Sequence, residues 1–101
     1  MCGIVAELGE RDSLAGARML RRLTHRGPDG EGSAAVGSSW LSHRRLAIVD
    51  LEGGDQPLRT HDGELWLVGN GEIYNHADVR RSIGSSEFET RSDNEAALRL
   101  I

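Results

Sequence analysis

The chain has 101 residues, enough for one modest domain, and its formal net charge is −4 with charged residues of both signs interspersed. This acidic balance argues against a nucleic-acid partner and against docking on an anionic membrane surface. Hydrophobic residues make up 38% of the chain and aromatic residues only 4%, so the core must consist mainly of aliphatic side chains. A chain of this size buries roughly two-thirds of its unfolded surface, which allows a single small core.

The only cysteine is Cys2, directly after Met1, so it cannot take part in an intrachain disulfide. Without a signal-peptide core or an apolar run of ~20 residues, we expect a cytoplasmic protein. Removal of Met1 would place an α-amino group and a thiol on the same residue. Because an α-amino group titrates near pH ~8 and a thiol near ~8.5, the amine can act as the base for the thiol. The alternative interpretation of Cys2 is a small buried hydrophobe at a strand end.

The first elements are predicted from apolar patterns and capping residues. Residues 2–8 are apolar on both faces, which predicts a short strand in the centre of a sheet. After a turn, a helix is expected to begin at Asp12 or Ser13, whose side chains can accept the first N–H groups, and to end near Thr24. Its apolar residues recur at helical spacing, and we interpret it as an ordinary packing helix.

Residues 26–30, Arg-Gly-Pro-Asp-Gly, form a strong loop signal. Proline disfavours helix at the residue before it, and Asp-Gly favours a tight turn. On its own this segment predicts a surface turn. Strands are expected at 32–36 and 39–43, with a hairpin turn at residues 37–38 between them.

Arg44 and Arg45 precede an apolar segment, 46–50, for which we predict a strand. A solvated charge pair is the ordinary interpretation of the two arginines, but a guanidinium at a strand end can also bind a carboxylate in a bidentate manner. A loop is expected at 52–57 and a further strand at 64–69.

Asn70 and Gly71 follow that strand. Asn-Gly is a common hairpin turn, which is the structural interpretation. In the functional interpretation, the side-chain amide and the glycine N–H converge on one point and stabilise an oxyanion. Beyond this pair, a short helix is predicted at 76–83 and a brief strand at 87–90.

Ser92 and Glu95 have the spacing of a capping box, with Ser92 as N-cap of a helix that continues to Ile101. Because this helix stops after two turns on apolar residues, we expect the sequence to be part of a longer one. No metal site is expected, because the histidines lack cysteine or carboxylate neighbours at ligand spacing. These scattered histidines are His25, His43, His61 and His76.

Several segments together resemble one family, the class II, or N-terminal-nucleophile, glutamine amidotransferases, and within it the glutamine-dependent asparagine synthetases. They occur in the family's order and comprise residues 1–5, 26–30, 43–50, 56–57, 70–75 and 92–95. Met-Cys-Gly-Ile opens several class II amidotransferases. Arg-Gly-Pro-Asp-Gly and Asn-Gly-Glu-Ile-Tyr-Asn are more particular to the asparagine synthetases.

The resemblance implies an α/β (α+β) fold, a four-layer α/β/β/α sandwich with antiparallel sheets, of which residues 1–101 would be the N-terminal portion. The second half of the glutaminase domain and a synthetase domain, or a partner subunit, would lie outside this chain. ATP and magnesium are implied for that synthetase domain, and no cofactor is expected within this chain. Strands without partners would leave exposed edges, so we expect homo-oligomers or poor solubility.

The resemblance also implies a reaction. Cys2 would attack the side-chain amide of glutamine, and the Asn70 amide with the Gly71 N–H would form the oxyanion hole. Ammonia would leave, and water would hydrolyse the γ-glutamyl thioester to glutamate. The ammonia would serve the ATP-dependent synthesis of asparagine from aspartate.

Substrate recognition follows from the same resemblance. Arg45 would bind the α-carboxylate of glutamine, and Glu72 with Asp93 would bind its α-ammonium group. The pocket would also be lined by the segment from residue 46 to residue 49, through Leu46, Ile48 and Val49.

Two other functions are compatible with these residues. One is a class II amidotransferase part that supplies ammonia to a different acceptor, such as a sugar phosphate or a phosphoribosyl compound. The other is a non-catalytic fragment that binds glutamine or a partner chain.

Overall fold

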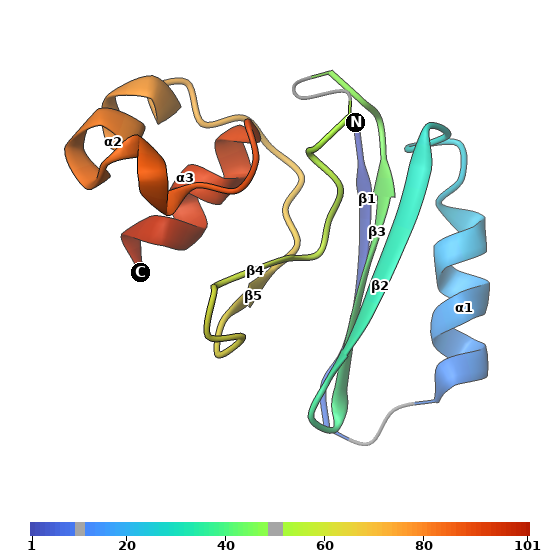
Figure 1. The fold of residues 1–101 in the computed structure, drawn as a ribbon. Helices are drawn as coiled ribbons and strands as arrows, with labels where there is room; N and C mark the ends of the chain where they lie inside the picture. The colour runs from blue at the N-terminus through green and yellow to red at the C-terminus, as the bar shows by residue number, and fades with distance from the viewer. Residues whose placement is uncertain (10–11, 49–51) are drawn as a thin grey trace.

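Two antiparallel sheets separate the helices in the computed structural model, which describes residues 1–9, 12–48 and 52–101. Across the molecule, a first helix is followed by a three-stranded sheet, a two-stranded sheet and the C-terminal helices (Figure 1). This arrangement confirms the α/β class with antiparallel sheets. That these residues form only the N-terminal portion of a larger domain stays a prediction.

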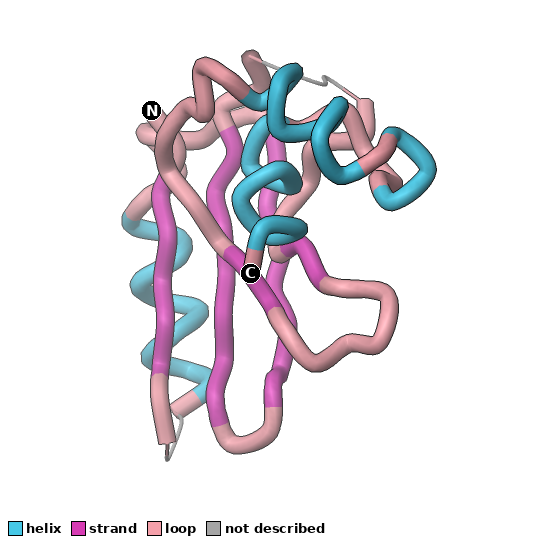
Figure 2. The backbone as a smooth tube through the Cα atoms, turned by 90° about the vertical axis from the view of Figure 1, so that its left-hand side faces the viewer, coloured by secondary structure: helices cyan, strands magenta, loops and turns pink. Residues whose placement is uncertain are grey.

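The three-stranded sheet has the order β1-β3-β2, with antiparallel neighbours throughout. Figure 2 shows its long strands side by side. The strands are β1 Gly3–Glu7, β2 Gly30–Val36 and β3 Ser39–Arg45. The expected hairpin turn joins β2 to β3, and Gly37 has the positive φ of 59° that favours glycine there. The expected central position of the first strand is wrong, because β3 lies between its two neighbours and β1 forms an edge. Along β1, Ile4 is exposed while Val5 is buried.

Helix α1, Ser13–Arg22, packs against this sheet. Asp12 caps it as expected, since its carboxylate accepts two backbone N–H groups of the first turn. A Cβ on Gly16 would lie 2.5 Å from the Trp40 ring, so only glycine permits this close approach of helix and sheet. Leu20 is buried in the same layer.

The segment after β3 is not the predicted strand, because side chains take its backbone groups. The Leu46 N–H donates to the Cys2 sulfur, and the Ala47 N–H donates to the Asp29 carboxylate. Residues 46–48 are therefore irregular, and the rest of the expected strand lies outside the described residues.

The second sheet consists of two short strands, β4 Leu58–Arg59 and β5 Trp66–Leu67. Strand β5 is shorter than the predicted 64–69. The reason lies at Gly69, whose N–H donates to the Gln56 side chain rather than to a neighbouring strand. Asn70 and Gly71 lie in irregular backbone after β5, so the hairpin interpretation of this pair is wrong.

The C-terminal part is helical. Its elements are α2 His76–Ile83, the 3-10 helix η1 Ser85–Glu87 and α3 Asp93–Leu100. Helix α2 agrees with its prediction, whereas the strand at 87–90 is wrong because the Glu89 and Thr90 N–H groups donate to the Glu95 carboxylate. Ser92 is the N-cap of α3 as expected, but the capping box is wrong. Ser92 makes no side-chain cap bond, and its own N–H donates to the Thr90 hydroxyl instead of to Glu95.

Apolar burial is divided between the two sides of the molecule. In the described residues, the buried hydrophobic side chains are Val5, Leu20, Leu58, Ala96 and Leu98. Val5 and Leu20 belong to the layer of α1 and its sheet, and the other three to the layer of α3 and β4. No helix in the described ranges is long and apolar enough to cross a membrane.

Candidate active site

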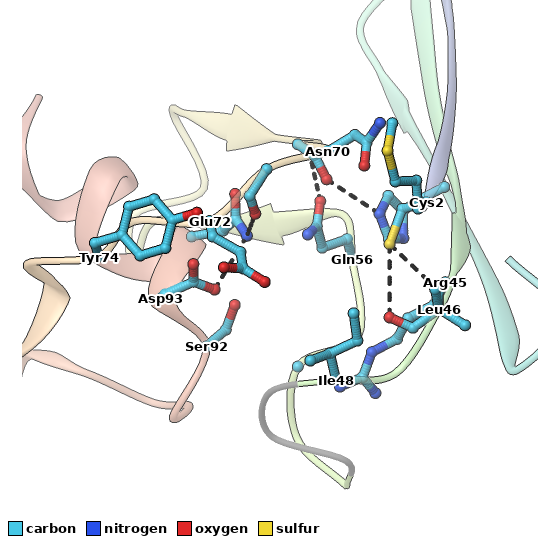
Figure 3. A pocket seen from close by; sticks show the side chains of 16 residues that line it. Cys2, Arg45, Leu46, Ile48, Gln56, Asn70, Glu72, Tyr74, Ser92 and Asp93 are labelled. Carbon is cyan, nitrogen blue, oxygen red and sulfur yellow. Dashed lines mark hydrogen bonds between the residues drawn. The ribbon is translucent and has the colours of Figure 1, made fainter. Parts of the chain in front are cut away.

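A cavity of about 330 Å³ lies where the end of β3 faces the loop after β5 (Figure 3). Every predicted site residue in the described part of the chain lines this cavity. These are Cys2, Arg45, Leu46, Ile48, Asn70, Gly71, Glu72 and Asp93. Val49, for which a place in the pocket was expected, lies outside the described residues.

Cys2 stands directly before β1 and is half-buried. Its sulfur accepts the Leu46 N–H at 3.3 Å and lies 3.7 Å from the Leu46 carbonyl oxygen, to which the thiol can donate. Its own carbonyl accepts a hydrogen bond from Arg26 Nε at 3.1 Å. The interpretation of Cys2 as merely a buried hydrophobe is thus incomplete, because its sulfur faces a cavity and is held by backbone polar groups.

The 26–30 segment is more than a surface turn. The Asp29 N–H donates to the Arg45 carbonyl at 2.9 Å, and the Asp29 carboxylate accepts the Ala47 N–H at 2.8 Å. A Cβ on Gly27 would lie 2.3 Å from the Arg44 carbonyl carbon, so the backbone of this loop touches the backbone of β3 there. This loop therefore fixes the backbone on either side of Leu46, which in turn holds the Cys2 sulfur.

Arg45, the last residue of β3, is only 6% exposed, and its Nη1 lies 3.0 Å from Asp55 Oδ1. The Asp55 side chain is 78% exposed. The Arg45 guanidinium thus already binds one carboxylate, that of Asp55, which is the chemistry that the resemblance implies for it.

The loop after β5 forms the opposite wall of the cavity, and Figure 3 shows Glu72 and Asp93 across from Cys2. Within the described residues, neither the Asn70 side-chain amide nor the Gly71 N–H makes an intramolecular hydrogen bond. Both groups are therefore available as donors to a ligand. Glu72 is exposed beside them.

Asp93, at the start of α3, is 6% exposed. Its Oδ2 accepts the Ile73 N–H at 2.6 Å, which ties α3 to the loop that carries Glu72. Arg80 of α2 donates to the Ser92 carbonyl at 2.6 Å. The Asp93 carboxylate is therefore bound to the loop, while Arg80 holds the backbone just before it, and the carboxylate contributes negative charge to the cavity.

Two buried polar residues, His43 and Gln56, complete the site. Gln56 Oε1 accepts the Gly69 N–H at 2.6 Å, and His43 Nε2 lies 3.2 Å from the Gly69 carbonyl oxygen. Because a carbonyl oxygen can only accept, Nε2 carries the proton. Burial lowers the pKa of His43 from its ordinary value of 6.5, with a further lowering by the Arg45 charge, against the opposing effect of the Gly69 hydrogen bond. The imidazole is therefore held neutral at pH 7.

Comparison with known proteins identifies the family. The pattern of the glutamine amidotransferase domain family matches residues 1–101. The chain belongs to this family. It is 45% identical to an asparagine synthetase (glutamine-hydrolysing) of Asparagus officinalis and 43% identical to one of Arabidopsis thaliana, with 99% of this chain covered in each case. A third, from Sandersonia aurantiaca, is 44% identical over the same share. The chain spans only about 18–20% of the length of these relatives.

The described residues predicted for the site line this cavity, whereas three other polar residues of its lining were not predicted. His43 and Gln56 lie in segments that carry the resemblance, but no role was assigned to them. Asn94, which also lines the cavity, was likewise missed. The only signal was the presence of these residues in the motifs, since their partners lie 13 to 26 residues away in the chain.

The charges of the cavity suit a free amino acid. A guanidinium, two carboxylates and two unpaired donors surround a thiol, which is the set needed to hold a carboxylate, an ammonium group and a developing oxyanion. Among the described residues, no group of three histidine, cysteine or acidic side chains could hold a metal ion.

Proposed function

We propose that this amidotransferase domain hydrolyses glutamine to glutamate and ammonia through a γ-glutamyl thioester on Cys2. The observation that carries the proposal is the convergence of the Cys2 sulfur, the Asn70 and Gly71 donors and the Asp93 carboxylate on one cavity. Its volume of about 330 Å³ lies at the small end of the range of roughly 300–1,000 Å³ for small-molecule sites, which suits one amino acid.

The first half of the reaction forms the thioester. Removal of Met1 exposes the α-amine of Cys2, which takes the thiol proton as the sulfur attacks the amide carbon. Asn70 and the Gly71 N–H stabilise the resulting oxyanion. The amine then gives the proton to the amide nitrogen, the C–N bond breaks, and ammonia leaves.

The second half regenerates the enzyme. Water attacks the thioester carbonyl, with the α-amine as the general base, and the same two donors again stabilise the oxyanion. The C–S bond breaks, the thiol recovers its proton, and glutamate leaves. Throughout, Arg45 binds the α-carboxylate, while Glu72 and Asp93 bind the α-ammonium group.

We further propose that the ammonia serves the synthesis of asparagine from aspartate. The names of the relatives support this acceptor over a sugar phosphate or phosphoribosyl compound. Since the chain spans about a fifth of their length, a synthetase domain or partner subunit would complete the protein, and ATP and magnesium would bind there. A cytoplasmic location fits, because that compartment keeps the required thiol reduced.

The proposal is tested by glutamate release from glutamine, measured on the protein expressed with all residues that its gene encodes. We expect turnover by the wild type and none above background for Cys2→Ala. Cys2→Ser retains the shape but should be strongly impaired, because a hydroxyl is a much weaker nucleophile at neutral pH. Equal glutamate release by the wild type and Cys2→Ala would refute the mechanism and leave a binding module.

A further inference from the structure

Gly69, the residue before the proposed oxyanion hole, has both of its backbone polar groups bound by buried side chains. Its N–H donates to Gln56 Oε1 at 2.6 Å, and its carbonyl oxygen lies 3.2 Å from His43 Nε2. Gln56 is 7% exposed and His43 is 1% exposed. In a longer β5, these backbone groups would bond to a neighbouring strand. Here the position of the backbone depends on two side chains.

A third side chain binds the same loop two residues later. Asn94 Nδ2 lies 3.3 Å from the Gly71 carbonyl oxygen and also 3.3 Å from Asp93 Oδ1. A Cβ on Gly69 would come within 2.6 Å of Asn94 Oδ1, so the loop and the start of α3 are in close contact. Asn94 thus links the oxyanion loop to a carboxylate of the substrate site.

The buried imidazole has no other assignment in the proposed reaction. His43 Nδ1 is buried without a hydrogen-bond partner among the described residues. Its only hydrogen bond there is the one from Nε2 to Gly69. A buried polar atom without a hydrogen-bond partner destabilises the folded state, so packing alone does not account for an imidazole at this position.

We propose that His43, Gln56 and Asn94 are positioning residues that hold residues 69–71 so that the Asn70 amide and the Gly71 N–H meet the oxyanion formed at Cys2. The inference rests on the proposed glutamine hydrolysis. A displacement of about 1 Å in such a group can cost on the order of 10²-fold in rate. Because the three residues act on the oxyanion donors, their loss should lower kcat with little change in the KM for glutamine.

The experiment uses the protein with all residues that its gene encodes and compares paired variants. Gln56→Met removes the acceptor at similar length, and His43→Leu removes the donor. Each should lower kcat by about 10- to 100-fold, less than the ~10²–10³-fold loss typical for an oxyanion donor itself. KM should stay within about threefold. His43→Gln places an amide N–H near the position of Nε2 and should recover most of the lost kcat.

Two further measurements separate positioning from general destabilisation. Leu20→Ala weakens the packing of α1, far from the loop, and should leave the kcat of the folded protein unchanged. Alkylation of Cys2 by iodoacetamide needs no oxyanion, so its rate should be the same in the wild type and in Gln56→Met. If Gln56→Met has lost its fold, its alkylation rate will differ from that of the wild type. In that case His43→Gln, which keeps the hydrogen bond to Gly69, is compared with the wild type instead.

Non-additivity gives the sharpest test. If Gln56 acts through the oxyanion donors, Gln56→Met should cost much less in an Asn70→Ala background than in the wild type. Equal losses in the two backgrounds, or a wild-type kcat in both Gln56→Met and His43→Leu, would overturn the inference while leaving glutamine hydrolysis intact. A wild-type protein that releases no glutamate would overturn the proposed function and this inference with it.

Discussion

The two walls of the cavity are built in different ways. On the sheet wall, Cys2 and Arg45 are attached to β1 and β3, which pair from Gly3↔Arg44 to Glu7↔Trp40. On the loop wall, Asn70 and Glu72 lie in irregular backbone. That backbone is held by separate hydrogen bonds from buried side chains rather than by a ladder.

This difference determines where substitutions should act. In β1 and β3 many backbone hydrogen bonds of the sheet hold the chain, so a side-chain substitution in these strands leaves the backbone in place. On the loop wall, each lost side-chain hydrogen bond leaves a buried group without its partner, at a cost of roughly 1–3 kcal/mol. Substitutions in the loop wall should therefore lower the catalytic rate. Substitutions in the regions that anchor this wall should lower the free energy of unfolding.

On the loop wall, the largest expected effect on catalysis is that of Asn70→Ala. Loss of one oxyanion donor should lower kcat by ~10²–10³-fold, or about 2.7–4 kcal/mol of transition-state stabilisation. Steady-state kinetics of glutamate release measure it. The matched control is Asn75→Ala, an exposed asparagine of the same loop whose side chain makes no cap bond to α2, and it should retain wild-type kcat. Near-wild-type turnover in Asn70→Ala would remove the oxyanion assignment.

The next effect concerns the anchor of α3. Glu95 is 2% exposed, accepts the Glu89 and Thr90 N–H groups, and pairs with Arg99 at 3.0 Å. Glu95→Gln replaces one acceptor oxygen by an NH₂ group and leaves Arg99 buried without its charge partner. We expect a loss of about 3–5 kcal/mol in the free energy of unfolding, measured by urea denaturation.

The control for that variant is Glu64→Gln, at an exposed position, which should change the free energy of unfolding by less than about 0.5 kcal/mol. A loss below about 1 kcal/mol in Glu95→Gln would show that the buried pair does not anchor α3.

The smallest effect is a pH dependence of stability from His43. Its pKa in the folded protein lies below the ordinary 6.5, so as the pH falls through 6.5 the unfolded chain binds a proton before the folded protein does. The stabilisation that comes from the neutral His43 is complete above pH 6.5. It decreases at lower pH until His43 is protonated in the folded protein as well. The slope from this group cannot exceed about 1.4 kcal/mol per pH unit.

Urea denaturation between pH 8 and pH 5 measures that slope. The variant His43→Gln has no titrating group there and should show a flatter profile. Identical slopes in the wild type and the variant would contradict the assignment of a neutral buried imidazole. Glu95 adds a separate loss at lower pH. Burial raises its pKa, but hydrogen bonds led by the Thr90 hydroxyl outweigh this and hold the pKa below its ordinary 4.5.

Elements with local signals were predicted well. The hairpin at Gly37, the cap at Asp12 and the helix at 76–83 each depend on a few neighbouring residues. The two wrongly predicted strands lie where a side chain from elsewhere in the sequence accepts the backbone N–H groups. Asp29 prevents a strand at 46–48, and Glu95 prevents one at 87–90. Apolar composition alone cannot reveal such competition.

The residues of the site also fall into a predicted group and a group that was not predicted. Cys2, Asn70 and Arg45 were predicted because their chemical types stand in recognisable motifs, and the structure brings them to one cavity. Their roles stay predictions. His43 and Gln56 were missed because a buried histidine or glutamine has many ordinary uses, and only the fold shows that both bind Gly69.

The most direct test of the nucleophile is covalent labelling with diazo-oxo-norleucine, a glutamine mimic that alkylates a nucleophilic thiol with loss of N₂, followed by mass spectrometry of the N-terminal peptide. We predict a peptide that lacks Met1 and carries one adduct on Cys2, with labelling slowed by glutamine and absent in Cys2→Ala. A peptide that keeps Met1 and stays unlabelled, or an adduct on another residue, would contradict the central claim.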